Sequence, residues 1–255
     1  MNTILTELQH KLIVSCQAFP DSPLYGPDYL QKMAMCAIKG GAGGIRACWP
    51  DNVKAIRSIT DLPIIGINKV GFDDPQSLDK VYITPSFESA AEVIEAGANI
   101  LGIDCTPRGR TYDDINKIIE QIKKHYPEIL IMADLSTVEE GMKAEEMGVD
   151  IVSTTLAGYT RSSLNPSILN KSTSMDATEL EELIHEEVPD LDLIKALKKS
   201  VKVKINAEGR FWEVDQVVDA IKYGADMVTV GAAITMPEKI TSKFVSAINT
   251  VCPSN

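Results

Sequence analysis

Short strand-like runs alternate with amphipathic segments along this 255-residue chain. Near the C-terminus two such runs, 205–208 and 227–230, each stop at a glycine, Gly209 and Gly231. Residues 213–223 between them place apolar side chains at the i, i+3, i+4, i+7 spacing of one helix face. The residues of that face are Val214, Val217, Val218 and Ile221. The pattern predicts a unit of strand, loop, helix, strand and loop.

The same unit recurs upstream and predicts eight strands. They cover residues 12–17, 43–47, 63–69, 97–104, 129–134, 149–155, 205–208 and 227–231. Gly97, Gly148 and Gly224 each stand between a helix and a strand, where a residue with positive φ is favourable. Strands that alternate with helices imply a parallel sheet. Eight such units in about 250 residues predict an α/β fold, a single (β/α)8 TIM barrel that spans residues 1–255.

Two segments interrupt this rhythm. Residues 82–85 are interpreted as an insertion between strand three and its helix, not as a barrel strand. Residues 161–200 are a long insertion between strands six and seven, with a loop at 162–176 and helices expected at 178–185 and 191–199. Its acidic side chains are interpreted as a solvated face. The alternative is that the insertion forms a lid or an oligomer contact.

Polar residues stand where the predicted strands end. They are Gln17, Arg46, Lys69, Asp104, Asp134, Thr154, Thr155, Glu208, Arg210 and Gly231. Because barrel active sites lie at the C-terminal ends of the strands, we expect these residues to meet at one mouth, with Thr155 among the substrate contacts. The alternative is structural: Arg46 with Asp104, or Lys69 with Glu208, would form ion pairs that only close the barrel top.

The composition and charge of the chain limit the kinds of molecule that it is expected to bind. The formal net charge of −11 argues against nucleic acid and anionic membranes, because both require a positive surface. No apolar run approaches the roughly 18 residues of a membrane span. The five cysteines lack CxxC spacing and indicate reduced thiols in a cytoplasmic protein. Among them, Cys16, Cys48 and Cys105 are expected to be buried apolar fillers.

The motifs that would mark other chemistries are missing. The chain has no HExxH, no clustered histidines and no CxxC, so no metal site is expected. His10, His125 and His185 are predicted to lie at the surface. There is also no GxSxG nucleophile elbow and no GxGxxG after a strand, so neither a serine hydrolase nor a dinucleotide site is indicated.

A lysine, carboxylates and an anion cradle remain. Gly209, Gly231 and Ala232 leave backbone N–H groups unobstructed, as at the phosphate sites after the last two strands of many barrels. Lys69 ends an apolar strand, where a lysine can lose its proton and act as a base. This set suits proton abstraction beside a carbonyl on a phosphorylated substrate, or a Schiff base.

Several segments, taken in order, resemble the N-acetylmannosamine-6-phosphate 2-epimerases. They are LIVSCQA at 12–18, IRA at 45–47, PIIGI at 63–67, YITP at 82–85, MAD at 132–134, STTL at 153–156 with GYT at 158–160, EGR at 208–210 and GAAIT at 231–235. The resemblance implies a (β/α)8 barrel of bacterial sialic acid breakdown, a homodimer that needs no cofactor and acts on a small phosphorylated amino sugar. It also implies that Lys69 is the acid–base residue at C2, that Glu208 is its catalytic partner, and that Gln17, Arg46 and Asp134 hold the sugar.

The chain departs from this family pattern at the end of the last motif. The family has an arginine that helps to bind phosphate where this chain has Met236, which offers neither charge nor donor. Either another cation replaces it, Arg210 or one from 161–200, or the substrate is unphosphorylated N-acetylmannosamine. Two further alternatives are a barrel lyase that uses Lys69 as a Schiff base and a non-catalytic sugar-binding barrel.

Overall fold

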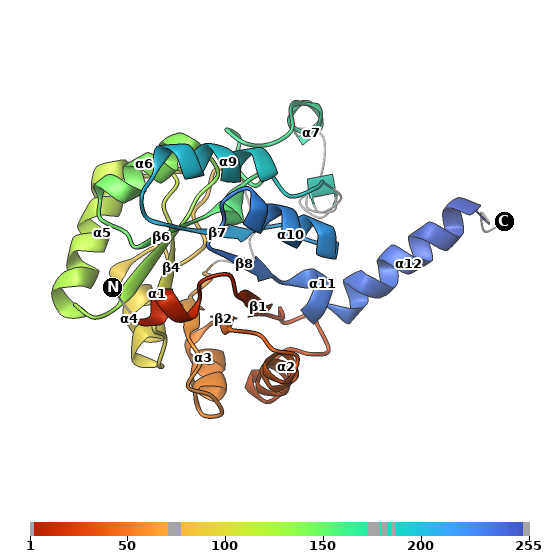
Figure 1. The fold of residues 1–255 in the computed structure, drawn as a ribbon, viewed down its shortest axis with the longest axis horizontal. Helices are drawn as coiled ribbons and strands as arrows, with labels where there is room; N and C mark the ends of the chain where they lie inside the picture. The colour runs from red at the N-terminus through yellow and green to blue at the C-terminus, as the bar shows by residue number, and fades with distance from the viewer. Residues whose placement is uncertain (1–2, 71–77, 173–178, 180–182, 185–186, 252–255) are drawn as a thin grey trace.

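The computed structural model describes residues 3–70, 78–172, 179, 183–184 and 187–251. Eight parallel strands form a closed barrel in sequence order, with helices around the outside (Figure 1). The predicted (β/α)8 TIM barrel is therefore confirmed. The strands are β1 (Leu12–Cys16), β2 (Gly44–Cys48), β3 (Ile64–Ile67), β4 (Ile100–Asp104), β5 (Leu130–Asp134), β6 (Ile151–Ser153), β7 (Lys204–Glu208) and β8 (Met227–Val230).

The helices begin at the end of the barrel where the strands finish. Ser86, Thr111 and Thr137 are N-caps whose hydroxyl oxygens accept a backbone N–H from the third residue of the following helix. These caps fix the loops around the barrel mouth. The helices are α1 (Thr3–Glu7), α2 (Pro27–Lys39), α3 (Pro50–Arg57), α4 (Phe87–Glu95), α5 (Tyr112–His125), α6 (Val138–Glu146), the short 3-10 helix η1 (Thr154–Leu156), α7 (Pro166–Ser172), α9 (Leu191–Ser200), α10 (Val214–Lys222), α11 (Ala232–Thr235) and α12 (Pro237–Val251).

The barrel interior changes from apolar to polar along the strands. Side chains of a strand alternate between its two faces, so every second residue points inward. The first inward layer is apolar, and Leu8, which follows α1, packs against it and closes that end. Its strand residues are Ile13, Ile65, Ile100, Leu130, Met132, Ile151 and Met227. Two residues further along four of these strands lie the buried polar side chains of Ser15, Asp134, Ser153 and Thr229.

Each observed strand overlaps its predicted range, although most bounds differ by one to three residues. Gly97, Gly148 and Gly224 have φ of 110°, 81° and 112°, as a residue that ends a helix with positive φ requires. Residues 82–85 do not join the barrel: Ile83 forms an isolated antiparallel bridge with Lys69. The helix α3 begins at Pro50, which suits the first helical position.

The boundaries assigned to the long insertion between strands six and seven were wrong at its C-terminal end. The predicted helix at 191–199 is observed as α9, but α9 is the barrel's own helix between β6 and β7. It contacts α6 and β7 and buries Leu193, Ile194 and Leu197. The predicted loop contains α7 and lies partly outside the described residues, as does most of the helix expected at 178–185.

The predicted apolar face of α10 is buried only in part. Val217 and Ile221 pack against the core, whereas Val214 is 79% exposed and Val218 45% exposed. The helix lies over β8 and beside α9 and has no further cover on that side among the described contacts. In Figure 1, α12 extends away from the barrel, and none of its residues is buried. No helix in the described ranges is long and apolar enough to cross a membrane.

Leu8, which closes one end of the barrel, gives a stability test. Leu8 is fully buried, so Leu8→Ala should lower the free energy of unfolding by about 2–5 kcal/mol, through lost burial and the cavity that remains. Chemical denaturation measures this change. Glu7→Ala, at an exposed neighbouring position, is the control and should change stability by less than about 0.5 kcal/mol. Equal stability of the Leu8→Ala protein would show that α1 does not close the barrel.

Candidate active site

A cavity of about 820 Å³ opens at the C-terminal ends of the strands. This volume lies within the usual range for small-molecule sites. Most of the residues predicted for a site line it together: Gln17, Arg46, Lys69, Thr155, Glu208, Gly209, Arg210, Gly231 and Ala232. Asp104 and Asp134 do not line it. The predicted convergence at one mouth is thus observed for residues of β2 and β7 and of the segments that follow β1, β3, β6, β7 and β8.

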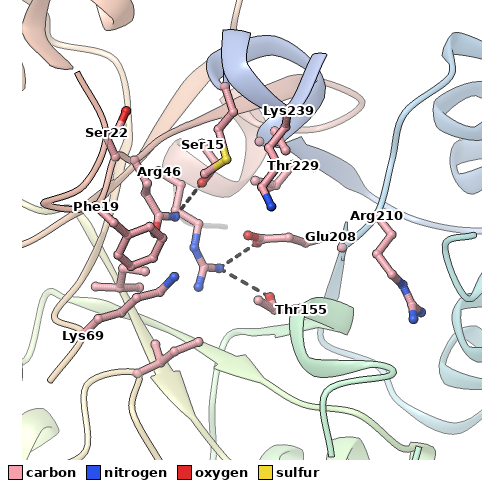
Figure 2. A pocket seen from close by; sticks show the side chains of 18 of the residues that line it. Ser15, Phe19, Ser22, Arg46, Lys69, Thr155, Glu208, Arg210, Thr229 and Lys239 are labelled. Atoms are coloured by element: carbon pink, nitrogen blue, oxygen red, sulfur yellow. Dashed lines mark hydrogen bonds and ion pairs between the residues drawn. The ribbon is translucent and has the colours of Figure 1, made fainter. Parts of the chain in front are cut away.

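Arg46 lies at the centre of the site and is 1% exposed. Its guanidinium donates to Asp134 through two nitrogens, Nη1 to Oδ1 at 3.0 Å and Nη2 to Oδ2 at 2.7 Å. Nη1 also donates to Glu208 Oε2 at 2.7 Å (Figure 2). A bidentate, charge-assisted pair of this kind fixes the guanidinium plane. Asp134 therefore lies beneath Arg46, where it orients the arginine instead of facing the cavity.

Neighbouring side chains hold the two carboxylates. The Thr155 hydroxyl donates to Asp134 Oδ1 at 2.5 Å, and Arg46 Nη1 lies 3.5 Å from the same hydroxyl oxygen. Asn206 Nδ2 donates to Glu208 Oε2 at 3.2 Å. The Thr229 hydroxyl in turn donates to Asn206 Oδ1 at 2.9 Å. The network connects strands β2, β5, β7 and β8 across the barrel.

A glycine in the barrel wall leaves space beside this ion pair. A Cβ at Gly102 would lie 2.5 Å from Ile67 Cγ2, which is closer than side-chain atoms approach one another. It would lie 3.5 Å from Asp134 Oδ2 and 3.6 Å from Arg46 Nη2, which are ordinary contact distances. The absence of a side chain at this inward position of β4 therefore makes room for Ile67, which packs next to the arginine and its partner carboxylate.

The carboxyl group of Glu208 is poised to titrate near neutral pH. Burial, and to a lesser extent the negative charge of Asp134, raise its pKa, and Arg46 opposes them, with a result of about 7. Burial would lower the pKa of Arg46, but the charges of Asp134 and Glu208 outweigh it and raise that pKa. The arginine therefore stays charged while its glutamate partner can exchange a proton.

Lys69 reaches the cavity from the loop after β3. Its ammonium lies 4.8 Å from the centre of the Phe19 ring and 6.0 Å from that of Tyr82. Aromatic faces at such distances attract a cation. Trp49 Nε1 donates to the backbone oxygen of Lys69 at 2.8 Å, and its ring packs edge-on against Phe19 at 5.9 Å. An aromatic wall therefore fixes where the lysine enters the site.

Gln17 lines the cavity and, within the described part of the chain, has a buried acceptor without a partner. Its Nε2 donates to Ser15 Oγ at 2.7 Å, which leaves the amide oxygen directed elsewhere. Among the described residues, that oxygen is buried without a hydrogen-bond partner. A buried acceptor without a partner is costly unless a ligand supplies a donor. Gln17 is thus placed to accept from a hydroxyl or an amide N–H of a bound molecule.

The loops after β7 and β8 form the remaining wall. Gly209 and Arg210 have φ of 109° and 60°, a turn that brings backbone to the cavity and sends the Arg210 side chain away from Arg46 (Figure 2). The Thr154 hydroxyl, in η1, bonds to both the backbone N–H and the carbonyl of Glu208 and so holds the end of β7. Ala232 begins α11, so the predicted loop after Gly231 is helical within one residue.

The ion pairs proposed as a structural alternative are not those observed. Asp104 does not pair with Arg46: Arg108 Nη2 lies 2.5 Å from its Oδ2, and Thr106 donates to its Oδ1 through both N–H and hydroxyl. Arg46 pairs instead with Glu208, the residue suggested as a partner of Lys69. The Asp104 cluster is separate from the cavity wall and shapes the loop after β4.

Sequence reasoning missed several residues that line the cavity. Phe19, Trp212 and Tyr159 supply aromatic surface, and Ser22 supplies a hydroxyl, all from loops whose path the apolar pattern does not define. Lys239 is the missed cation. It stands three residues after Met236, within the first turn of α12, and the helical start at Pro237 is the signal that would have placed it beside the cavity.

The remaining polar candidates do not form a second site. Cys16, Cys48 and Cys105 are buried, as predicted, and burial raises the pKa of the Cys16 thiol to about 12 and that of Cys48 to about 11. Thiols of this kind are poor nucleophiles. His10 and His125 are exposed, whereas His185 lies outside the described residues. Within the described ranges no three His, Cys, Asp or Glu side chains gather as metal ligands would.

Comparison with known proteins places the chain beside one family of sequence relatives. Residues 30–250 match the family described as "Putative N-acetylmannosamine-6-phosphate epimerase". A protein of Caldanaerobacter subterraneus subsp. tengcongensis with the name "Putative N-acetylmannosamine-6-phosphate 2-epimerase" is 42% identical over 249 residues, which cover 96% of this chain and 94% of the relative. A Clostridium perfringens protein with the same name is 38% identical over 242 residues, or 94% and 98% of the two chains.

A solved structure agrees with these relatives. The N-acetylmannosamine-6-phosphate 2-epimerase from Clostridium perfringens superimposes with a TM-score of 0.80 at 33% identity and covers 96% of both chains. The likeness extends over the whole barrel and is not confined to one motif.

The site generates a prediction about the titration of Glu208. Carbon NMR of the labelled glutamate side chains should show Glu208 titrating near pH 7. Asp134→Asn removes a neighbouring negative charge, so it should lower that pKa. Asp192→Asn, at an exposed position of α9, is the control and should leave the titration unchanged. An ordinary glutamate pKa in the unmodified protein, or a rise in the Asp134→Asn variant, would contradict the electrostatics described here.

Proposed function

The chain belongs to the N-acetylmannosamine-6-phosphate epimerase family, and from this membership we propose that it is a 2-epimerase that interconverts N-acetylmannosamine 6-phosphate and N-acetylglucosamine 6-phosphate without a cofactor. One observation carries the proposal: Lys69 and the Glu208 carboxyl group, the latter held by Arg46, face the same cavity. An isomerase that inverts one carbon needs a proton acceptor and a proton donor around it.

The reaction follows from the acidity of the sugar's C2–H. In the open-chain form C2 lies beside the C1 aldehyde, so a base can take its proton, and the C–H electron pair becomes the enolate. Return of a proton to the opposite face of C2 inverts that centre and restores the aldehyde. No atom is gained or lost, and the substrate is neither oxidised nor reduced.

We assign the proton transfers to Lys69 and Glu208. A catalytic acid or base works best when its pKa lies near the working pH, and Glu208 meets that condition. Arg46 donates to Glu208 and remains charged, so it can also stabilise negative charge on the enolate oxygen. The rings of Phe19 and Tyr82 lie near the Lys69 ammonium and Trp49 donates to the Lys69 backbone oxygen, so these aromatic side chains position the lysine.

The substrate contacts remain predictions. Gln17, with an acceptor oxygen in the wall, suits a sugar hydroxyl or the N-acetyl N–H. Thr155 lines the cavity and can contact the sugar directly. Asp134 acts through Arg46, which it orients. Backbone at Gly209, Gly231 and Ala232 is proposed to face the phosphate.

Two alternatives differ in what they predict for this site. Met236 favours a free sugar as substrate, because the methionine side chain offers no contact to a phosphate. A lyase that forms a Schiff base through Lys69 would be trapped by borohydride in the presence of substrate, whereas an epimerase that only moves protons would not.

The wider setting of the enzyme is proposed on the same basis. We propose one catalytic domain over residues 1–255, in the cytoplasm, that serves the breakdown of sialic acid. The family, the buried free thiols and the expected small phosphorylated substrate support this setting.

A homodimer is proposed from the surface of α12. The helix exposes Phe244, Val245, Ile248 and Val251, with exposed fractions of 69%, 49%, 64% and 79%. Large apolar side chains grouped on one helix are typical of an interface with another protein. On α10, Val214 and Val218 are exposed as well, so the barrel offers a second apolar surface for the same purpose.

The catalytic assignment predicts loss of proton exchange at C2. Lys69→Ala and Glu208→Gln should each lower, by about 10²–10⁴-fold, the rate at which C2 of N-acetylmannosamine 6-phosphate takes up deuterium in heavy water, measured by NMR. Lys124→Ala, at an exposed lysine of α5, is the control and should retain full exchange. Absence of exchange in the unmodified protein, with the sugar phosphate and with the free sugar, would refute the epimerase function.

The same assay has a predicted pH dependence. When Lys69 and Glu208 both carry a proton, neither can accept the proton from C2. Epimerisation in either direction therefore requires that one of the two side chains is deprotonated. Because the Glu208 pKa is raised to about 7, kcat/KM should fall as pH decreases through about 7. In Glu208→Gln this acid limb should disappear from the residual rate. If kcat/KM of the Glu208→Gln variant still falls at low pH in the same way, the titrating group is not Glu208.

The dimer is tested by mass in solution. Phe244→Asp combined with Ile248→Asp places charges on the apolar face of α12 and should convert a dimer to a monomer in light scattering after gel filtration. Ser246→Asp, on the same exposed helix, is the matched control and should remain dimeric. A monomeric unmodified protein at micromolar concentration would contradict the dimer.

A further inference from the structure

A second lysine enters the cavity from α12. Lys239 is half-buried and lines the cavity together with Met236. Figure 2 shows its side chain directed into the site on the side of Thr229, away from Lys69. Within the described part of the chain, its ammonium makes no hydrogen bond or ion pair, whereas Arg46 is bound by two carboxylates. The Lys239 charge is therefore open to a ligand.

The other cation near this wall is turned away. The Arg210 guanidinium lies against Gly158, where an added Cβ would be 2.1 Å from Nη1, and its centre is 6.0 Å from that of the Tyr159 ring. In Figure 2 it points away from both Arg46 and Glu208. Arg210 would have to change its rotamer and leave this packing to reach a substrate at Glu208.

The segment that carries Lys239 is held on both sides. The Thr235 hydroxyl donates to the backbone oxygen of Ser15 at 2.9 Å, which ties the start of the segment to β1. One turn beyond Lys239, the Lys243 ammonium lies 2.6 Å from Glu213 Oε1 and 5.2 Å from the centre of the Trp212 ring. These contacts fix the first turn of α12 beside the loops after β7 and β8.

The charged side chains of the cavity form two groups, which would meet different parts of the substrate. Lys69, Arg46 and Glu208 surround the reacting carbon, C2, and C6 lies four carbons further along the same chain. Lys239 enters on the side of Thr229, away from Lys69 (Figure 2), and the neighbouring Glu238 lines the cavity as well. An ammonium within reach of a phosphate oxygen forms a charge-assisted hydrogen bond. The site therefore offers a proton-transfer end and a cationic end.

We propose that Lys239 binds the 6-phosphate of the substrate and supplies the positive charge that Met236 does not. This inference rests on the proposed epimerase function. It makes Lys239 the residue that sets the preference for phosphorylated over free N-acetylmannosamine, and it assigns no phosphate contact to Arg210.

The test compares two substrates and a set of charge variants. kcat and KM are measured with N-acetylmannosamine 6-phosphate and with N-acetylmannosamine for the unmodified protein, Lys239→Gln, Lys239→Arg and Arg210→Gln. Lys54→Gln, at an exposed position of α3, controls for the lost charge. A double variant, Met236→Arg with Lys239→Gln, offers a cation from the neighbouring position. Binding of the phosphorylated sugar is measured separately by calorimetry.

The inference predicts a loss confined to one substrate. Lys239→Gln should lower kcat/KM for the phosphorylated sugar by about 10- to 100-fold, mostly through KM, and leave the free sugar within about twofold. Lys239→Arg should keep most of the activity, and Met236→Arg should restore part of what Lys239→Gln loses. Lys54→Gln should match the unmodified protein.

Four results would overturn it. They are an unchanged Lys239→Gln enzyme, an equal loss with both sugars, a phosphate-specific loss in Arg210→Gln instead, and an unmodified protein that turns over only the free sugar. If the unmodified protein epimerises neither sugar, the proposed function fails, but calorimetry still decides this inference. Weaker binding of the phosphorylated sugar to Lys239→Gln supports it, and equal or absent binding overturns it.

Discussion

A buried guanidinium between two carboxylates determines the organisation of this barrel mouth. Taking a charge out of water is unfavourable unless partners compensate it, and Arg46 has almost no exposed surface. Asp134 binds it through two hydrogen bonds, and Glu208 takes a third. Burial and the nearby charge of Asp134 make Glu208 hold a proton more tightly than an ordinary glutamate does, with a pKa of about 7 although Arg46 opposes the shift. The same buried charges thus hold the barrel mouth together and set the pKa of Glu208.

The layers of the barrel explain why this arrangement occurs at one end only. The end near α1 is filled by aliphatic side chains and closed by Leu8, which supplies burial without any polar group to satisfy. One layer further, Asn206 forms hydrogen bonds with Ser153, with Thr229 and with the carboxylate of Glu208. A network of this kind stabilises only if its members are satisfied, and a rigid apolar layer below holds them in register. The exposed mouth is then formed by loops, where residues can vary without loss of the core.

The sequence was sufficient to predict the barrel, because the hydrophobic periods of strands and helices differ and because glycines stand where a helix ends and the next strand begins. It was also sufficient for the residues that end strands, such as Arg46 and Glu208, since parallel strands bring their ends together. Two kinds of feature could not be predicted from the sequence: the partners of charged side chains, and the cavity residues that come from distant loops. The partner of a charge depends on side-chain geometry, so Asp104 was paired with the wrong cation and Asp134 was placed in the cavity instead of beneath Arg46. Residues from distant loops and from α12, such as Trp212 and Lys239, reach the site through turns that hydrophobic periodicity does not encode.

The missing side chain at Gly102 restricts which sequences can form this site. Gly102 does not line the cavity, yet the space it leaves is filled by Ile67, beside Arg46 and Asp134. Those four positions form one packing unit on four neighbouring strands, β2 to β5, so a change at any of them alters the room left to the others. A larger side chain at position 102 would first have to displace Ile67, which packs beside the guanidinium and its carboxylate. A position that does not line the cavity therefore limits the residues that can stand around it.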